Sequence, residues 1–243
     1  MLNKISVLIT NFNKEKYLKN CLKNVTNQNY KNYEIILFDD CSFDGSREIL
    51  NKFKNIKVIY NDLKKFSYGE LNQINGIIEA FKKSTGSIIC LLDADDLFLK
   101  NKLKLINKYF EKNKHKKIVF DFPKTTDSQF IFKKKMSKKI WPTIFPTSCI
   151  SIRRKFFLSF LKHIDRNNFN SLEIDARITI FFNFYYDEYN VLKKNLTKYC
   201  FDPKGITSGK IKFSKKWWIR RSQAFEYMKN ILKKKNKNNS LSF

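Results

Sequence analysis

The sequence predicts an α/β protein with an open, mostly parallel sheet that carries helices on both faces. Short apolar runs at 5–9 and 88–92 lack the polar alternation of a half-exposed strand, so they are typical of strands buried on both faces. Each early run is followed by a polar turn and then by an amphipathic helical pattern. This repeated order predicts parallel strands joined by right-handed crossovers.

Four strands and three helices are expected in the first half of the chain. The strands are predicted at 5–9, 34–38, 56–60 and 88–92. The intervening helices carry apolar residues at helical spacing around 17–25, 49–53 and 71–81. Asp44, Gly45 and Ser46 are expected to cap the second helix, and Gly86 to terminate the third.

Composition indicates a folded protein with a strong positive charge. The 243 residues are 42% hydrophobic and 16% aromatic, above the level of a disordered chain, and the formal net charge is +27. Such a charge favours anionic partners, namely nucleic acid, a phospholipid surface or a phosphorylated ligand. The lysines are spread over the whole chain beside many Asn, Ile and Phe residues, so an AT-biased coding sequence is an equally good explanation.

Cysteine usage and hydropathy predict a cytoplasmic protein, either soluble or peripheral on the inner face of the membrane. The five cysteines are odd in number and contain no C-x-x-C pair, as expected of free thiols in a reducing compartment. Apolar runs stay shorter than a membrane span of about 18 residues, and Met1 leads directly into a strand without a signal-peptide core.

A short acidic motif, Asp93-Ala94-Asp95-Asp96, follows the strand at 88–92. Ligands of open α/β sheets bind outside the carboxyl ends of the strands, where Thr10 and Asp40 are also expected. Closely spaced carboxylates repel one another unless a cation neutralises them, and oxygen ligands suit Mg²⁺ or Mn²⁺. The alternative is a solvated turn or a helix cap.

Other nucleotide-binding and hydrolytic motifs do not occur in this sequence. A G-x-G-x-x-G fingerprint and a G-x-x-x-x-G-K-[ST] loop are both missing, so phosphate is expected to be held through a metal. The two histidines, His115 and His163, lie in basic polar stretches and are predicted to be surface residues.

Three segments, 5–13, 39–46 and 93–96, together resemble the family 2 inverting glycosyltransferases with the GT-A fold. The resemblance covers about residues 3–112. It implies that the first two strand ends hold the nucleobase and ribose, and that the acidic motif binds ribose and the divalent metal on the diphosphate. The nucleotide-binding residues implied in this way are Thr10, Asn13, Asp40, Asp93, Ala94 and Asp95, with Asp95 as the metal ligand.

The chain departs from the family pattern at two places. Gln73-Ile74-Asn75 stands where an arginine often precedes the asparagine, so one phosphate or donor contact is expected to be missing or moved. Cys41 stands where a glycine is expected, which is tolerable only if that residue does not need a positive φ.

The second half is expected to hold the acceptor side and the chemistry. A strand is predicted at 118–122 and an extended segment at 143–152. Asp175 precedes the apolar stretch 178–186, as in the helix where the family places its catalytic carboxylate, and the alternative for Asp175 is a simple helix-capping acid. Glu173 and Asp165 are reserve candidates.

The C-terminal segment 214–243 is predicted to be a basic amphipathic helix with a tail, separate from a transferase domain at 1–213. That domain comprises a nucleotide-binding half, 1–112, and an acceptor-side half, 113–213. Trp217, Trp218 and Phe225 belong to an apolar stripe surrounded by lysines and arginines. The stripe either packs on its own domain or, through Trp217 to Lys235, contacts an anionic membrane surface.

The sequence thus predicts a bacterial enzyme of surface polysaccharide biosynthesis that uses Mn²⁺ or Mg²⁺. It would transfer a sugar from a nucleotide diphosphate donor, a UDP-sugar, to a hydroxyl of a glycan or lipid-linked acceptor with inversion. The rival functions are a basic protein that binds nucleic acid or membrane, and an inactive transferase that only binds nucleotide. Nucleic acid is not expected as a partner, because the aromatic and basic residues are not interleaved in an RNA-binding motif.

Overall fold

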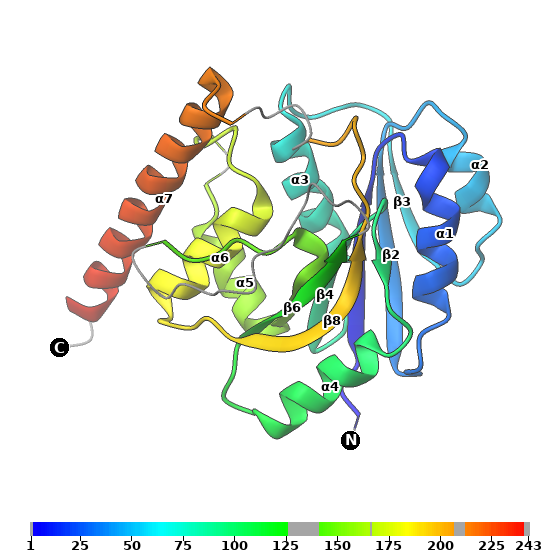
Figure 1. Cartoon of the computed structure of the whole chain (residues 1–243), viewed down its shortest axis with the longest axis horizontal. Helices are drawn as coiled ribbons and strands as arrows, with labels where there is room; N and C mark the ends of the chain where they lie inside the picture. Colours follow the sequence, from blue (N-terminus) through cyan, green and yellow to red (C-terminus); the bar gives the residue numbers. More distant parts are fainter. Residues whose placement is uncertain (1, 126–140, 166, 207–211, 241–243) are drawn as a thin grey trace.

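The computed structural model describes residues 2–125, 141–165, 167–206 and 212–240. Its centre is an eight-stranded sheet with the order β3-β2-β1-β4-β7-β6-β8-β5, covered by helices on both faces (Figure 1). This architecture confirms the predicted α/β class.

The first half of the chain builds the regular, parallel part of the sheet. Strands β1, β2, β3 and β4 pair in parallel, and Leu8 of β1 lies between Ile36 and Leu91 of its neighbours. The elements are β1 (Ile5–Asn11), α1 (Glu15–Thr26), β2 (Tyr33–Asp40), α2 (Ser46–Asn51), β3 (Lys57–Asn61), α3 (Gly69–Lys82) and β4 (Ile88–Asp93). All four predicted strands and all three predicted helices are therefore confirmed.

The second half is mixed. Strand β7 runs antiparallel to both β4 and β6, β8 is parallel to β6, and β5 is antiparallel to β8. The elements are β5 (Leu97–Phe98), α4 (Lys102–Lys112), β6 (Ile118–Thr125), the short 3₁₀ helix η1 (Thr147–Cys149), β7 (Ile150–Arg153), α5 (Arg154–His163), α6 (Ile174–Tyr185), β8 (Val191–Tyr199) and α7 (Lys215–Ser240).

Several local predictions for the connections were wrong. The segment 143–152 is extended only in part, because η1 interrupts it and β7 begins at Ile150. The structure also contains α5 and β8, which the sequence did not predict. Of the two histidines predicted at the surface, His115 is exposed and His163 is half-buried, with its ring centre 4.8 Å from that of Tyr185.

Gly86 does not terminate α3 as expected. The helix ends at Lys82, and Gly86 lies instead beside the start of β1. A Cβ atom on Gly86 would come within 2.6 Å of the backbone nitrogen of Ser6, so only glycine allows this close approach of two chain segments.

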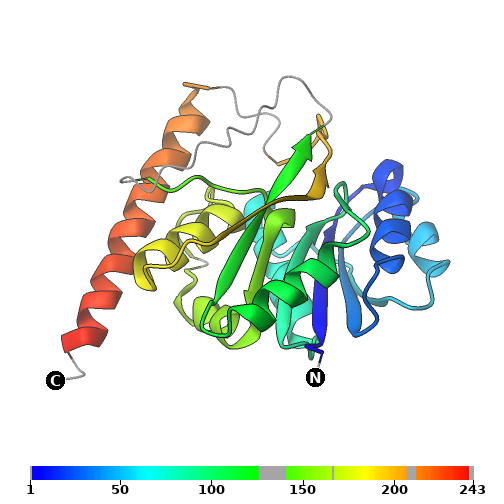
Figure 2. The ribbon, with the colours of Figure 1, turned by 60° about the horizontal axis from the view of Figure 1, so that its bottom comes forward.

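The two faces of the sheet carry separate apolar cores, because successive side chains of a strand point to opposite faces. Val7 and Ile9 of β1 pack with α1, α2 and α4, whereas Leu8 belongs to the core formed with α3, α5, α6 and α7. Figure 2 shows the same layers with the lower part of the molecule turned forward.

Helix α7 lies along α6 (Figure 1). Its inner face buries Ala224, Tyr227 and Ile231, which confirms that this segment packs on its own domain. The predicted apolar stripe is buried only in part, because Trp218 and Phe225 remain exposed. Among the described residues, no helix combines the length and apolarity needed to span a membrane.

Candidate active site

Three carboxylates converge at the carboxyl end of β4. Asp93, Asp95 and Asp96 each present an oxygen, and these three oxygens lie within 4.8 Å of one another. Asp93 and Asp95 are half-buried and Asp96 is buried. Hard, oxygen-rich clusters of this kind suit Mg²⁺ or Mn²⁺.

Burial and mutual repulsion shift the pKa values of two carboxylates in this cluster. Burial, reinforced by the charges of Asp95 and Asp175, raises the pKa of Asp93 to about 7. Burial and the charges of Asp95 and Asp93 also raise the pKa of Asp96 well above its ordinary value. One oxygen of Asp96, Oδ2, is buried without a hydrogen-bond partner in the described part of the chain. The donor set therefore fits a divalent ion, which would offset this repulsion.

Neighbouring elements fix the position of Asp93. Gln73 of α3 donates a hydrogen bond from Nε2 to Asp93 Oδ1 at 2.7 Å, and Thr10 Oγ1 lies 3.4 Å from the same oxygen. The backbone nitrogen of Asp93 donates to Ser148 Oγ at 3.0 Å. Gln73, which replaces the arginine of the family pattern, thus contacts the acidic motif itself.

A buried ion pair supports the loop that carries Ser148. Lys102 Nζ lies 2.6 Å from Asp121 Oδ2, both side chains are fully buried, and Lys102 also donates to the carbonyl oxygen of Ser148 at 2.7 Å. Thr197 of β8 completes the network by donating to Asp121 Oδ1 at 2.8 Å. Four elements, α4, β6, η1 and β8, therefore meet behind the acidic motif.

Lys14, at the start of α1, supplies a positive charge at the site. Its ammonium group lies 2.5 Å from Asp95 Oδ2 and also forms an ion pair with Asp202, which follows β8. Burial alone would lower the pKa of Lys14, but the two carboxylates outweigh it, and the pKa is raised. Lys14 thereby ties the segment after β8 to the acidic motif.

The ends of β1 and β2 form a second polar group beside the motif. Asn11 donates to Asp39 Oδ1 at 2.7 Å, and the backbone nitrogen of Asn13 donates to Ser42 Oγ at 2.9 Å. Cys41 has a φ of 58°, so the condition under which cysteine would be tolerated at the family's glycine position is not met. Cys41 therefore adopts a left-handed backbone conformation, which is sterically unfavourable for a residue with a Cβ atom.

Asp40 and Asp39 have different surroundings. Asp40 is buried, with 8% of its surface exposed, and accepts a hydrogen bond from Asn61 Nδ2 at 2.8 Å. Asp39 is fully buried and pairs with Arg47, whose Nε lies 3.1 Å from Asp39 Oδ2. Asp39 therefore holds the turn together, which leaves Asp40 as the acidic candidate at this strand end.

Asp175 lies in the first turn of α6, as predicted. It is half-buried, its Oδ1 accepts a hydrogen bond from the backbone nitrogen of Ala176 at 2.7 Å, and its charge reaches Asp93. Helix α6, which belongs to the second half of the chain, thus brings a fourth carboxylate within electrostatic range of the acidic motif.

The two reserve candidates have structural partners. Glu173 is buried and forms an ion pair with Arg220 of α7. Asp165 accepts hydrogen bonds from the backbone nitrogens of Asn167 and Asn168 at 2.9 and 3.0 Å and so closes a turn. Asp175 remains the preferred carboxylate for the chemistry.

The structure brings most of the predicted site residues together. Thr10 contacts Asp93, whose carboxylate lies beside that of Asp95, and the backbone nitrogen of Ala94 donates to the carbonyl oxygen of Thr10 at 3.2 Å. Asn13 follows β1, the neighbour of β4, and Asp40 ends β2, the next strand in the sheet. Sequence reasoning missed Lys14, Ser148 and Asp202, because a single lysine, serine or aspartate in a connecting segment carries no periodic or motif signal.

Comparisons with known proteins agree with this arrangement. Residues 6–170 match the family described as glycosyl transferase family 2. A Methanococcus voltae protein is 33% identical over 114 residues, 42% of this chain and 33% of its own length. It is a dolichyl N-acetyl-alpha-D-glucosaminyl phosphate 3-beta-D-2,3-diacetamido-2,3-dideoxy-beta-D-glucuronosyltransferase. The chain spans about half or less of the length of the curated relatives it matches.

Two solved structures share the fold at low sequence identity. S. aureus TarS in complex with UDP superimposes with a TM-score of 0.70 at 17% identity, covering 99% of this chain and 72% of that one. The mannosyltransferase PcManGT from Pyrobaculum calidifontis, in complex with GDP-Man and Mn²⁺, superimposes with a TM-score of 0.61 at 16% identity. This match covers 94% of this chain and 63% of that one. The fold is of the GT-A type, and since the family match spans more than half of the sequence, the chain belongs to glycosyl transferase family 2.

Proposed function

We propose that this protein transfers a sugar from a nucleotide diphosphate donor, a UDP-sugar, to a hydroxyl group of a glycan or lipid-linked acceptor with inversion at the anomeric carbon. The reaction would belong to surface polysaccharide biosynthesis. One observation carries the proposal: the Asp93, Asp95 and Asp96 carboxylates converge at the end of β4, and Asp175 on α6 lies within electrostatic range of Asp93.

The nucleotide would occupy the edge formed by the ends of β1, β2 and β4. Thr10, Asn13 and Asp40 are assigned to the nucleobase and ribose, and Asp93, Ala94 and Asp95 to the ribose and diphosphate side. The position of these residues at adjacent strand ends supports the assignment, because open α/β sheets bind ligands there. The UDP complex of TarS favours uracil as the base.

A divalent ion, Mn²⁺ or Mg²⁺, would be held by Asp95 with support from Asp93 and Asp96. The unpartnered Oδ2 of Asp96 and the raised pKa of Asp93 support a cation at this place, and the PcManGT complex favours Mn²⁺. When bound, the ion offsets the negative charge that builds on the departing diphosphate.

The chain itself would supply orientation and proton transfer. Gln73 and Thr10 orient the Asp93 carboxylate, and Ser148 holds its backbone nitrogen. Asp175 would remove the proton from the acceptor hydroxyl as that oxygen attacks the anomeric carbon from the face opposite the diphosphate. A lipid-linked acceptor is supported by the Methanococcus relative, whose name specifies a dolichyl phosphate sugar.

A thermal-shift panel tests the donor and metal assignments. We expect UDP-sugars with Mn²⁺ to raise the melting temperature more than GDP- or dTDP-sugars, because a ligand that binds only the folded state stabilises it. Asp95→Asn should remove the Mn²⁺-dependent part of this shift and leave the ligand-free protein folded. Asp187→Asn, at a surface carboxylate far from the motif, is the matched control.

Unchanged Mn²⁺-dependent UDP binding in Asp95→Asn would refute the metal assignment. UDP binding without any sugar transfer to glycan or lipid-linked acceptors would favour the rival interpretation, an inactive nucleotide-binding transferase.

A further inference from the structure

An exposed group of aromatic and basic residues surrounds the beginning of α7. We call it the α7 entry surface. Its apolar members are Phe213, Trp217, Trp218 and Ile219, and its basic members are Lys212, Lys215, Lys216 and Arg221. Phe213 is 63% exposed and Trp218 is 57% exposed.

The aromatic rings of this surface contact one another and their cations. The ring of Trp217 lies 5.1 Å from that of Phe213 and 4.7 Å from that of Trp218. The guanidinium of Arg221 lies 4.2 Å above the Trp217 ring. The ammonium group of Lys212 lies 4.9 Å from the centre of the Phe213 ring, so the three aromatic rings contact one another and two cations lie against them.

Packing does not explain these exposed rings. Helix α7 is anchored to α6 by a different face, which buries Ala224, Tyr227 and Ile231. Contiguous exposed apolar groups with a polar rim are typical of interaction surfaces. Tryptophan in particular favours the boundary between water and hydrocarbon, where its apolar ring and its N–H group are both satisfied.

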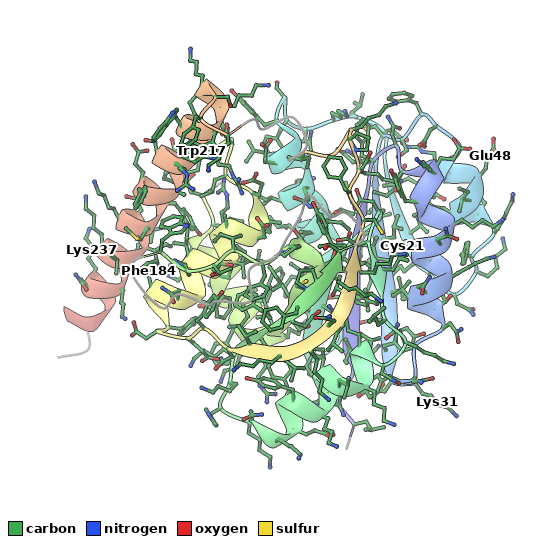
Figure 3. The ribbon with its side chains drawn as sticks, viewed as in Figure 1. Cys21, Lys31, Glu48, Phe184, Trp217 and Lys237 are labelled. Atoms are coloured by element: carbon green, nitrogen blue, oxygen red, sulfur yellow. The ribbon has the colours of Figure 1, made fainter. Side chains whose placement is uncertain are left out.

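The entry surface lies at the same end of the molecule as the candidate active site. In Figure 1 the chain starts at the bottom, β1 runs upward to its carboxyl end, and α7 begins at the top. Figure 3 labels Trp217 at this upper end and Lys237 toward the lower end. The ion pair between Arg220 and Glu173 joins the first turns of α7 to the residue that precedes α6, two positions before Asp175.

The charge of the surface identifies the partner. From Pro203 to Phe225 the sequence contains no acidic residue, and the whole chain carries a net charge of +27. Aromatic rings that lie among lysines and arginines match the headgroup region of an anionic bilayer, which offers negative charge above hydrocarbon.

We propose that the α7 entry surface docks on anionic lipid bilayers and turns the Asp175 side of the site toward the membrane. This inference rests on the proposed function in one respect, because the orientation matters for an acceptor that is carried on a lipid. Docking itself requires neither donor nor metal.

The test measures cosedimentation with phosphatidylcholine vesicles that contain phosphatidylglycerol, and with phosphatidylcholine alone as the uncharged control. We expect binding only to the anionic vesicles. Lys215→Gln with Lys216→Gln should weaken this binding about tenfold or more, since each lost charge near the surface has a large effect. The pair Lys229→Gln with Lys233→Gln removes the same charge further along α7 and should have a much smaller effect.

The aromatic contribution needs a separate variant. Trp218→Ser should also weaken binding about tenfold, while Leu158→Ser, at an apolar side chain of similar exposure on α5, should not. Equal losses for the two lysine pairs, or unchanged binding of Trp218→Ser, would overturn the proposal. So would a failure of the unmodified protein to bind anionic vesicles, or tighter Trp218-dependent binding to a short RNA.

The outcome is separable from the proposed function. Mn²⁺-dependent UDP binding, measured on the same samples by thermal shift, should be unchanged in Trp218→Ser. Vesicle binding without any UDP binding would refute the donor assignment alone, whereas UDP binding without vesicle binding would refute only the docking surface.

Discussion

The two halves of the molecule position their site residues by different means. In the first half, parallel strands end side by side, so Thr10, Asp40 and Asp93 reach one edge through the regularity of the sheet. In the second half, Asp175 depends on the N-terminus of α6, and the loop with Ser148 depends on the buried pair of Lys102 and Asp121. The first arrangement follows from strand periodicity, whereas the second follows from particular long-range contacts.

The largest effect is expected from the second half. Asp175→Asn should lower the rate of sugar transfer about a hundredfold to ten-thousandfold, because a general base must accept the proton of the attacking hydroxyl. UDP affinity should stay unchanged, since the proposed donor contacts lie in the first half. The measurement compares transfer rate with UDP affinity in parallel.

Asp165→Asn is the control for this variant, because the side chain of Asp165 closes a local turn in the same region. Near-normal transfer by Asp175→Asn would mean that Asp175 is a helix-capping acid. Glu173→Gln would then need testing, with the stability of α7 monitored, since Glu173 also pairs with Arg220.

Breaking the buried ion pair tests how strongly the second half relies on it. Lys102→Met leaves the Asp121 carboxylate buried without its partner, which should lower the free energy of unfolding by about 3–5 kcal/mol. Adding Asp121→Leu should recover much of this loss, because two apolar side chains replace two buried charges. Urea unfolding measures both values.

Lys104→Met, at an exposed lysine of the same helix, should change the unfolding free energy little. If Lys102→Met and the double variant Lys102→Met with Asp121→Leu were equally destabilised, the loss would come from side-chain packing and not from an unpaired buried charge.

The pH dependence of metal binding tests Asp93, the residue of the first half that lies within electrostatic range of Asp175 in the second half. Because the pKa of Asp93 is raised from 3.8 to about 7, the folded chain holds an extra proton between these pH values. The free energy of unfolding of the metal-free protein should therefore decrease as pH rises through this window. Mn²⁺ affinity should fall about tenfold per pH unit below about 7, since the ion must displace that proton.

Calorimetry over this pH range measures both effects. Gln73→Leu should move the profile to higher pH, because the hydrogen bond from Gln73 lowers the pKa of Asp93. A pH-independent Mn²⁺ affinity would show that Asp93 is not protonated in the folded protein.

The smallest effect concerns the turn after β2. Cys41→Gly should raise the free energy of unfolding by up to about 1 kcal/mol, because glycine adopts a φ of 58° without the side-chain clash, although it loses more backbone entropy on folding. Thermal unfolding provides the measurement. Cys41→Ala keeps the Cβ atom, so an equal gain in that variant would assign the effect to the thiol.

The same contrast explains what the sequence could predict. The strands at 5–9 and 88–92 and the polar turns after them follow from local patterns, so the fold class and the acidic motif were accessible. Helix α5 and strand β8 were missed because Lys193, Lys194 and the mixed polarity of Arg154–His163 blur the expected periodicity. The contacts of Lys14 with Asp202 and of Lys102 with Asp121 join residues far apart in the chain, and no single-sequence pattern encodes such pairings.

Lys14 gives the carboxylate cluster a tethered counter-ion. Its ammonium group belongs to the chain and remains near Asp95 at a high effective concentration, however dilute the free metal is. A divalent ion at the proposed metal site would therefore compete with a covalently attached monovalent one. Removing that ion by chelation would leave Asp95 and Asp202 with the Lys14 ammonium group as their cation.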